Sequence, residues 1–313
     1  MAEPLLRTVT RTSGANAALK DGTVTPSGFR FDFEEVPVLV QAFRRMVRGL
    51  EFDVTEMALT TYLVAREHGV RFTAVPVFLV RGFHHRAVQV LAGGDVRTPK
   101  DLEGRRVGVN RGYTVTTGVW ARSLLADEHG VDLSRVTWVL SGDEHVAAYR
   151  PPANVVPVES GRSLEELLRA GELAAVVGAD LDAADVVPLL PDADEAGLAA
   201  LRTRGLFPIN HLVVVRDDLL TEHPDLGAQV FDAFGRAKQV YVERLRAGDA
   251  SGPGDRTYRW VMQVTGADPL PYGLEPNRRV LEHLVRAAVD QGILERPVRL
   301  EDVFALGTHD LTA

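Results

Sequence analysis

The sequence contains no cysteine among its 313 residues. Disulfide bridges, thiolate nucleophiles and cysteine-ligated metal ions are therefore excluded. Acidic residues outnumber basic ones, and the formal net charge is −8. This balance argues against a protein that covers nucleic acid or an anionic membrane, although a local basic pocket can still hold an anion.

Long hydrophobic runs are also missing. The longest, such as residues 75–80, are far too short to cross a bilayer. The first residues, MAEPLLRTVTRTSG, contain no apolar stretch of the kind that a secretory signal needs. We therefore expect a cytoplasmic protein whose partner is a small carboxylate, with neither nucleic acid nor a membrane as a partner. Assembly into a homo-oligomer stays open.

Several motifs that mark cofactor sites are absent as well. The phosphate-binding patterns GxxxxGK[ST] and GxGxxG do not occur, which argues against a nucleotide cofactor. GxSxG is missing, which weakens a hydrolase interpretation. The nine histidines form neither an HExxH motif nor a tight cluster with acidic residues. We expect no cofactor and no metal ion.

Strands that alternate with helices are the main feature that is present. This order implies parallel α/β sheets, and the length suggests two domains. We predict one lobe from residues 1–96 plus 209–313 and a second from 97–208, with the ligand in a cleft between them near helix N-termini. The patterns predict strands over 72–78, 106–109, 136–140 and 207–215, and helices over 37–49, 114–129, 163–170, 224–247 and 276–291.

Five ordered strings carry a resemblance to a known family. They span residues 51–66, 76–85, 101–109, 205–211 and 271–278. Together they resemble the 4,5-dihydroxyphthalate decarboxylase family, which has the type 2 periplasmic-binding-protein fold. The resemblance implies a two-lobed α/β protein and a cofactor-independent decarboxylase, a carbon-carbon lyase, that acts on a small hydroxyaromatic carboxylic acid.

Two loops depart from the family's pattern. Residues 12–17 carry no charge, where family members have charged residues, and the loop after Val109 is one residue longer than usual. Both loops are expected to face the cleft. These departures leave the identity of the acid open, and with it the question whether decarboxylase activity is kept.

The loop after residue 109 is the strongest candidate for binding. A glycine-containing turn that leads from a strand into a helix directs backbone N–H groups toward an anion, and an arginine adds a charge-assisted contact. The alternative is that the threonines only cap the helix. The predicted substrate-binding residues of this loop are Asn110, Arg111, Tyr113, Thr114, Thr116 and Thr117.

Two histidines and a glutamate are candidates for proton transfer. His211 follows a proline at a strand and can act as a general acid or base; a buried structural histidine is the alternative. Asn210 can orient it or bind substrate. His85 is the second candidate, and strand alternation would place it on one face with Arg81, a possible grip for the acid. Glu56 can bind a phenol or relay a proton, or only complement a helix N-terminus.

Three other functions compete with decarboxylation. The same fold serves solute-binding proteins, which close around an organic anion without any reaction, and fold alone does not fix function. Another cytoplasmic enzyme of small acids and a small-molecule sensor are the remaining two. Stabilisation by an acid without release of carbon dioxide would favour the binding protein.

Overall fold

The structure is a computed structural model that describes residues 3–159, 161–181, 183–252 and 254–313. The chain divides into two compact units. Unit 1 comprises Met1–Gly82, Leu201–Glu282 and Val298–Ala313, and unit 2 comprises Phe83–Ala200 and His283–Pro297. Each unit holds one β-sheet. Among the described residues, no helix has the length and hydrophobicity that a bilayer span requires.

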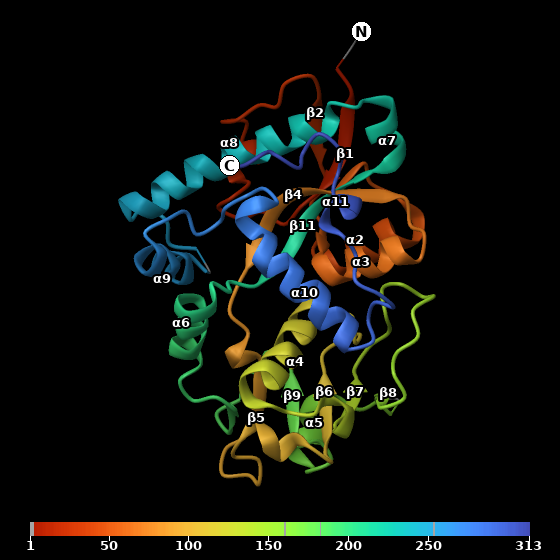
Figure 1. The fold of residues 1–313 in the computed structure, drawn as a ribbon, viewed down its shortest axis with the longest axis vertical. Coiled ribbons are helices and arrows are strands. Elements are labelled where there is room, and N and C mark those ends of the chain that lie inside the picture. Colours follow the sequence, from red (N-terminus) through yellow and green to blue (C-terminus); the bar gives the residue numbers. More distant parts are fainter. Residues whose placement is uncertain (1–2, 160, 182, 253) are drawn as a thin grey trace. The chain divides into compact units, whose positions relative to one another are not determined.

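Unit 1 is built on a five-stranded sheet with the order β2-β1-β3-β11-β4 (Figure 1). Strand β1 runs parallel to β2 and β3, whereas β11 is antiparallel to both of its neighbours. The long strand β11 therefore enters between β3 and β4, two strands that lie far from it in the sequence. The strands are β1 (Leu5–Val9), β2 (Arg30–Phe33), β3 (Val54–Ala58), β4 (Phe72–Arg81) and β11 (Ile209–Arg216).

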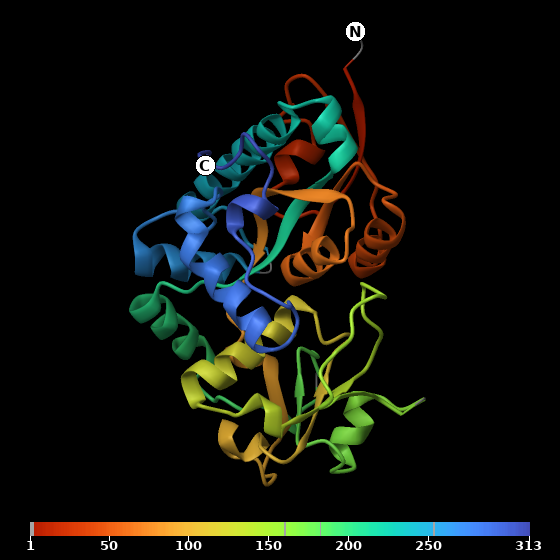
Figure 2. The same ribbon diagram turned by 45° about the vertical axis from the view of Figure 1, so that its right-hand side comes forward.

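Helices cover both faces of this sheet. Helix α2 buries a stripe that includes Leu39, Phe43 and Met46, at the spacing of an amphipathic helix. Figures 1 and 2 show α2 and α3 on one side of β11 and α8 on the other. The helices wholly within unit 1 are α1 (Ala17–Lys20), α2 (Leu39–Gly49), α3 (Leu59–Glu67), α7 (Asp217–Glu222), α8 (Leu226–Ala247), α9 (Asp255–Thr265), η4 (Glu275–Asn277) and α11 (Leu300–Val303).

Unit 2 is built on a six-stranded sheet with the order β10-β5-β9-β6-β7-β8. Strands β6 to β9 run parallel, and β5 is antiparallel to β9 and β10. A Cβ at Gly108, in β6, would lie 2.9 Å from both Leu164 and Leu173, so glycine allows their close approach. The strands are β5 (Val88–Leu91), β6 (Arg106–Val109), β7 (Thr137–Leu140), β8 (Val155–Pro157), β9 (Ala175–Val177) and β10 (Val186–Pro188).

Short helical segments connect these strands. Helix α5 starts from the predicted capping box, in which Ser163 accepts from the backbone of Glu166 and the Glu166 carboxylate accepts from that of Ser163. The segments wholly within unit 2 are η1 (His85–Ala87), η2 (Pro99–Leu102), α4 (Thr116–His129), η3 (Leu133–Arg135) and α5 (Leu164–Arg169). Helices α6 (Ala193–Arg204) and α10 (Arg278–Asp290) each have residues in both units.

The unit boundaries differ from the predicted ones. The prediction assigned 1–96 and 209–313 to one lobe and 97–208 to the other. In the structure residues 83–96 and 283–297 group with unit 2, and residues 201–208 group with unit 1. Strand β5 explains the first difference, because it pairs with β9 and β10 inside the sheet of unit 2.

Candidate functional site

Glu56 and His211 form a hydrogen-bonded pair on the sheet of unit 1. In the antiparallel pairing of β3 with β11, Glu56 lies opposite Val213, so His211, two residues along, is its diagonal neighbour on the same face. The imidazole Nδ1 lies 2.6 Å from Oε1 of Glu56. The structure therefore brings together two of the three residues predicted to carry chemistry.

The glutamate of this pair is fixed by the backbone. The Glu56 side chain is 1% exposed, and its Oε2 accepts a hydrogen bond of 2.8 Å from the N–H of Arg11. A carboxylate only accepts, so Nδ1 of His211 carries the proton of their hydrogen bond. The ring of Phe43 packs edge-on against the imidazole at 5.2 Å. These contacts fix both the tautomer and the orientation of His211.

The second ring nitrogen is the reactive end of the pair. The His211 side chain is 19% exposed, and its Nε2 has no hydrogen-bond partner within the part of the chain that the structure describes. An imidazole held at Nδ1 by a buried carboxylate can give or take a proton at Nε2. The pair thus has the arrangement that a general acid or base requires.

Arg81 lies at the end of β4 but has a structural place. Its guanidinium is buried and donates to the carbonyl oxygens of Phe207 and Pro271, at 3.4 and 3.2 Å, and to the side chain of Asn277. Burial lowers the pKa of Arg81 to about 10. The expected grip on a substrate is replaced by a network that ties β4 to the segment 271–277.

His85 does not share a strand face with Arg81, contrary to the expectation from alternation. Strand β4 ends at Arg81, and His85 begins the helical turn η1 in unit 2. Its Nε2 lies 3.1 Å from Oε2 of Glu128, and its buried Nδ1 has no partner among the described residues. His85 is thus held by a glutamate of α4. Asn210 is buried next to His211 on β11, and its role stays a prediction.

The predicted binding turn lies in unit 2, between β6 and α4. Arg111 has a positive φ of 68°, a conformation that costs a non-glycine residue roughly 1 kcal/mol, and its N–H donates to Ser141 at 2.8 Å. Its side chain is exposed. The turn is therefore held in a strained backbone shape by its neighbour after β7.

A carboxylate of the chain itself occupies this turn. Oε1 of Glu144 accepts from the N–H of Tyr113 at 2.5 Å, and Oε2 accepts from the N–H and the hydroxyl of Thr114, at 3.2 and 2.6 Å. The prediction that this turn suits a carboxylate agrees with this geometry. The carboxylate is an internal one, and the sequence analysis did not single it out.

The other residues of the turn have structural contacts. The Tyr113 ring is buried under the guanidinium of Arg122, 3.8 Å away, and the Asn110 side chain donates to the carbonyl of Gly178 at 2.9 Å. Thr116 and Thr117 open α4, but Val115 is its N-cap and no side chain caps it. The capping alternative for the threonines is therefore wrong.

Three residues of unit 2 have the composition of a catalytic triad without its geometry. Nε2 of His283 lies 3.0 Å from the Ser123 hydroxyl and 3.1 Å from Asp127. Arg286, which only donates, contacts Nδ1 at 2.9 Å. The proton of the imidazole therefore sits on Nε2, which cannot accept the Ser123 proton as a base must. This cluster attaches the returning segment 283–297 to α4.

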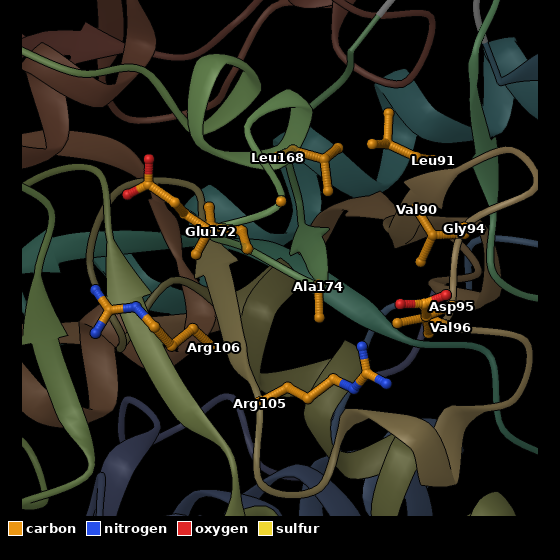
Figure 3. Close-up of a pocket in the computed structure, with 12 residues that line it drawn as sticks. Val90, Leu91, Gly94, Asp95, Val96, Arg105, Arg106, Leu168, Glu172 and Ala174 are labelled. Carbon is orange, nitrogen blue, oxygen red and sulfur yellow. The ribbon is translucent and has the colours of Figure 1, made fainter.

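A surface pocket of unit 2 lies away from these residues. It has a volume of about 420 Å³, and Figure 3 shows Arg105 reaching toward Asp95 on one side, with Arg106 and Glu172 on the other. It opens where β6 begins, at Arg106, whereas the turn follows the end of β6. Among the described residues, no three His, Asp or Glu side chains are grouped to hold a metal ion. The expectation that the turn and His211 line one cleft stays a prediction.

Solved structures with the same fold include proteins of different function. The aliphatic sulphonate binding protein SsuA from Escherichia coli aligns with a TM-score of 0.57 over 98% of this chain and 99% of its own, at 10% identity. The desulfurization enzyme DSZB aligns with a TM-score of 0.52 over 96% of both chains, at 15% identity. These likenesses show that the fold is the predicted two-lobed, periplasmic-binding-protein-like α/β fold.

Sequence relatives point to one family. No family model matches the chain. A 4,5-dihydroxyphthalate decarboxylase from Comamonas testosteroni is 30% identical over 282 residues, which cover 84% of this chain and 85% of the relative. A protein of the same name from Pseudomonas putida is 35% identical over 147 residues, 44% of this chain and 56% of that protein. The chain belongs to the 4,5-dihydroxyphthalate decarboxylase family.

Proposed function

We propose that this protein decarboxylates a small hydroxyaromatic carboxylic acid, as the names of its two relatives state for 4,5-dihydroxyphthalate. The observation that carries the proposal is the 2.6 Å hydrogen bond between the buried Glu56 and Nδ1 of His211. It leaves Nε2 as the nitrogen that exchanges a proton with a ligand. Cofactor-free decarboxylation needs such a proton donor.

The reaction replaces a carboxylate on the ring by a proton. The bond between the ring carbon and the carboxylate breaks, and its electron pair stays with the ring while carbon dioxide leaves. A hydroxyl ortho or para to the reacting carbon supports addition of a proton there, because its electrons stabilise the dearomatised intermediate. His211 in its doubly protonated form supplies this proton from Nε2, and Nδ1–H stays bonded to Glu56.

Glu56 acts through His211 in this scheme. Because its carboxylate is 1% exposed and already accepts from Arg11 and His211, it has no place for a substrate phenol. We assign it the role of a positioning residue, which also favours the imidazolium by its charge. In unit 2, Arg111 with its exposed side chain is the proposed cation for the acid.

Replacement of His211 tests the proposal. We expect His211→Gln to lower kcat about 100- to 10,000-fold, the usual contribution of a general acid. His223→Gln is the matched control, because His223 is the exposed partner of another glutamate of unit 1, 3.9 Å away. Carbon dioxide release is measured with 4,5-dihydroxyphthalate and with a panel of hydroxybenzoates, and full turnover by His211→Gln would refute the assignment.

The same panel separates catalysis from binding alone. An acid that raises the melting temperature without any release of carbon dioxide would identify a solute-binding protein on this fold. The proposal also includes a cytoplasmic place of action. Cell fractionation beside a periplasmic marker enzyme tests that part, and recovery with the marker would contradict it.

A further inference from the structure

The carboxylate of Glu144 fills a complete anion position. Two backbone N–H groups, of Tyr113 and Thr114, and the Thr114 hydroxyl converge on its two oxygens. Hydrogen bonds to a charged acceptor are the strong ones in proteins. A ligand carboxylate placed in this turn would have to use the same three donors.

The chain is shaped to admit this side chain. A Cβ at Gly112 would lie 2.5 Å from Oε2 of Glu144, so glycine at this position leaves the room that the carboxylate occupies. The loop that carries Glu144 is docked by a second contact, the hydrogen bond from the Arg111 N–H to the Ser141 hydroxyl. A Cβ at Gly142 would meet Cα of Arg111 at 3.3 Å, which shows how closely the two loops approach.

An internal carboxylate has an advantage over an external one. Glu144 is tethered to the turn, so its effective concentration there is on the order of millimolar or higher. A ligand carboxylate with the same three contacts would need a comparable free concentration to displace it. It would also place a second negative charge beside Glu144, which is unfavourable. The turn is therefore closed to a dilute anionic substituent.

We propose that Glu144 is a specificity-determining residue: it fills the carboxylate position of the turn, so that this protein takes hydroxyaromatic acids with one carboxylate in preference to those with two. The inference rests on the proposed function, which supplies the class of ligand. Within that class, it names the substituent that the chain rejects.

Two acids that differ by one carboxylate provide the test. We measure the Kd of 3,4-dihydroxybenzoate and of 4,5-dihydroxyphthalate by calorimetry, on the wild-type protein and on variants. We expect the monocarboxylate to bind the wild type more tightly. In Glu144→Ala the vacated donors should tighten dicarboxylate binding at least about tenfold, while the Kd of the monocarboxylate changes less than about threefold.

Two further variants make the result specific. Glu144→Gln keeps the shape and one acceptor oxygen, so it should shift the ratio of the two Kd values in the same direction by a smaller factor. Asp143→Asn removes a charge from the same loop without touching the three contacts, and it should leave the ratio unchanged. Circular dichroism melts verify that each variant is folded, and Glu144→Gln carries the test if Glu144→Ala does not fold.

The outcomes separate this inference from the proposed function. If either acid binds but the ratio is the same in wild type and in the folded Glu144 variants, the specificity role is refuted while decarboxylation stands. A wild type that prefers the dicarboxylate also refutes it. If no hydroxyaromatic acid binds the wild type or any variant, the proposed function fails and the inference fails with it.

Discussion

At the scale of single residues, Glu56 shows how a buried charge can direct a reactive neighbour. Its oxygens accept from the Arg11 N–H and from His211, so both of its lone-pair directions along β3 are committed. Such a carboxylate holds an imidazole in one tautomer, and loss of that support in other proteins costs activity more than structure. The role is testable apart from catalysis itself.

We expect Glu56→Gln to lower kcat about 10- to 100-fold while KM changes little, because the amide can no longer accept at both ends. Nitrogen NMR of His211 provides the second readout. The wild type should show the neutral imidazole protonated at Nδ1, and the variant should show a mixture with Nε2–H. An unchanged tautomer together with unchanged kcat would contradict the positioning role.

Residue patterns indicated one of these partners but not the other. His211 and Glu56 both fell within strings that matched the family, so each was a candidate before their contact was known. Glu144 lies about thirty positions from the turn it fills and in no such string. One signal was available: parallel strands β6 and β7 end at the same edge of a sheet, which brings the loops after residues 109 and 140 together.

At the scale of elements, helix α4 ends in a conflict between two effects. His129 occupies its last turn, where the helix dipole favours a protonated imidazole. Burial opposes the charge and, with a smaller contribution from nearby His85, lowers the pKa of His129, although Glu128 acts in the other direction. The buried Nε2 has no hydrogen-bond partner among the described residues. Desolvation therefore dominates here.

This lowering makes stability depend on pH in one direction. In the unfolded chain His129 takes up its proton near its ordinary pKa of about 6.5, before the folded chain does, so acidification below that pH favours unfolding. We expect the unfolding free energy from urea titrations to fall between pH 7.5 and 5.5, and His129→Gln to reduce that fall. His68→Gln, at an exposed histidine, is the control; an equal effect of both variants would contradict the prediction.

Elements were predictable where one signal dominated. Strand β6 and helix α5 are confirmed, the first by its apolar run and the second by its capping box. Strands β8 and β10 have three residues each, too few to show a period, and they were missed. Helix α9 was missed as well, since it follows a glycine-rich segment. The end of β4 was misplaced because side-chain alternation stops where hydrogen bonding stops, at Arg81.

At the scale of the whole chain, unit 2 is completed by a segment from near the C-terminus. Gln291 accepts from Nε of Arg122 at 2.7 Å and donates to the carbonyl of Val119 at 3.0 Å. His283 stacks on Trp120, and the Tyr149 hydroxyl donates to Gly292. The sequence could not reveal this return, because the helix pattern over 276–291 is continuous while its residues belong to both units.

The pairing of Arg122 with Gln291 measures what the returning segment contributes. Arg122 is fully buried, and burial lowers its pKa. Its other contacts are the Tyr113 carbonyl and the faces of two aromatic rings. Removal of one partner from a buried charge leaves that charge without compensation, which is more costly than removal of the charge itself. The two kinds of variant should therefore differ.

We expect Gln291→Ala to lower the free energy of unfolding of the full chain by about 2 to 4 kcal/mol, because Nε of Arg122 then has no acceptor. In an Arg122→Met background the same change should cost much less, and urea titration of the four proteins gives the coupling energy. Gln239→Ala, at an exposed pair with Glu243 on α8, is the control. Additive effects of the two changes would show that the segment 283–297 stabilises unit 2 by apolar packing instead of through the buried guanidinium.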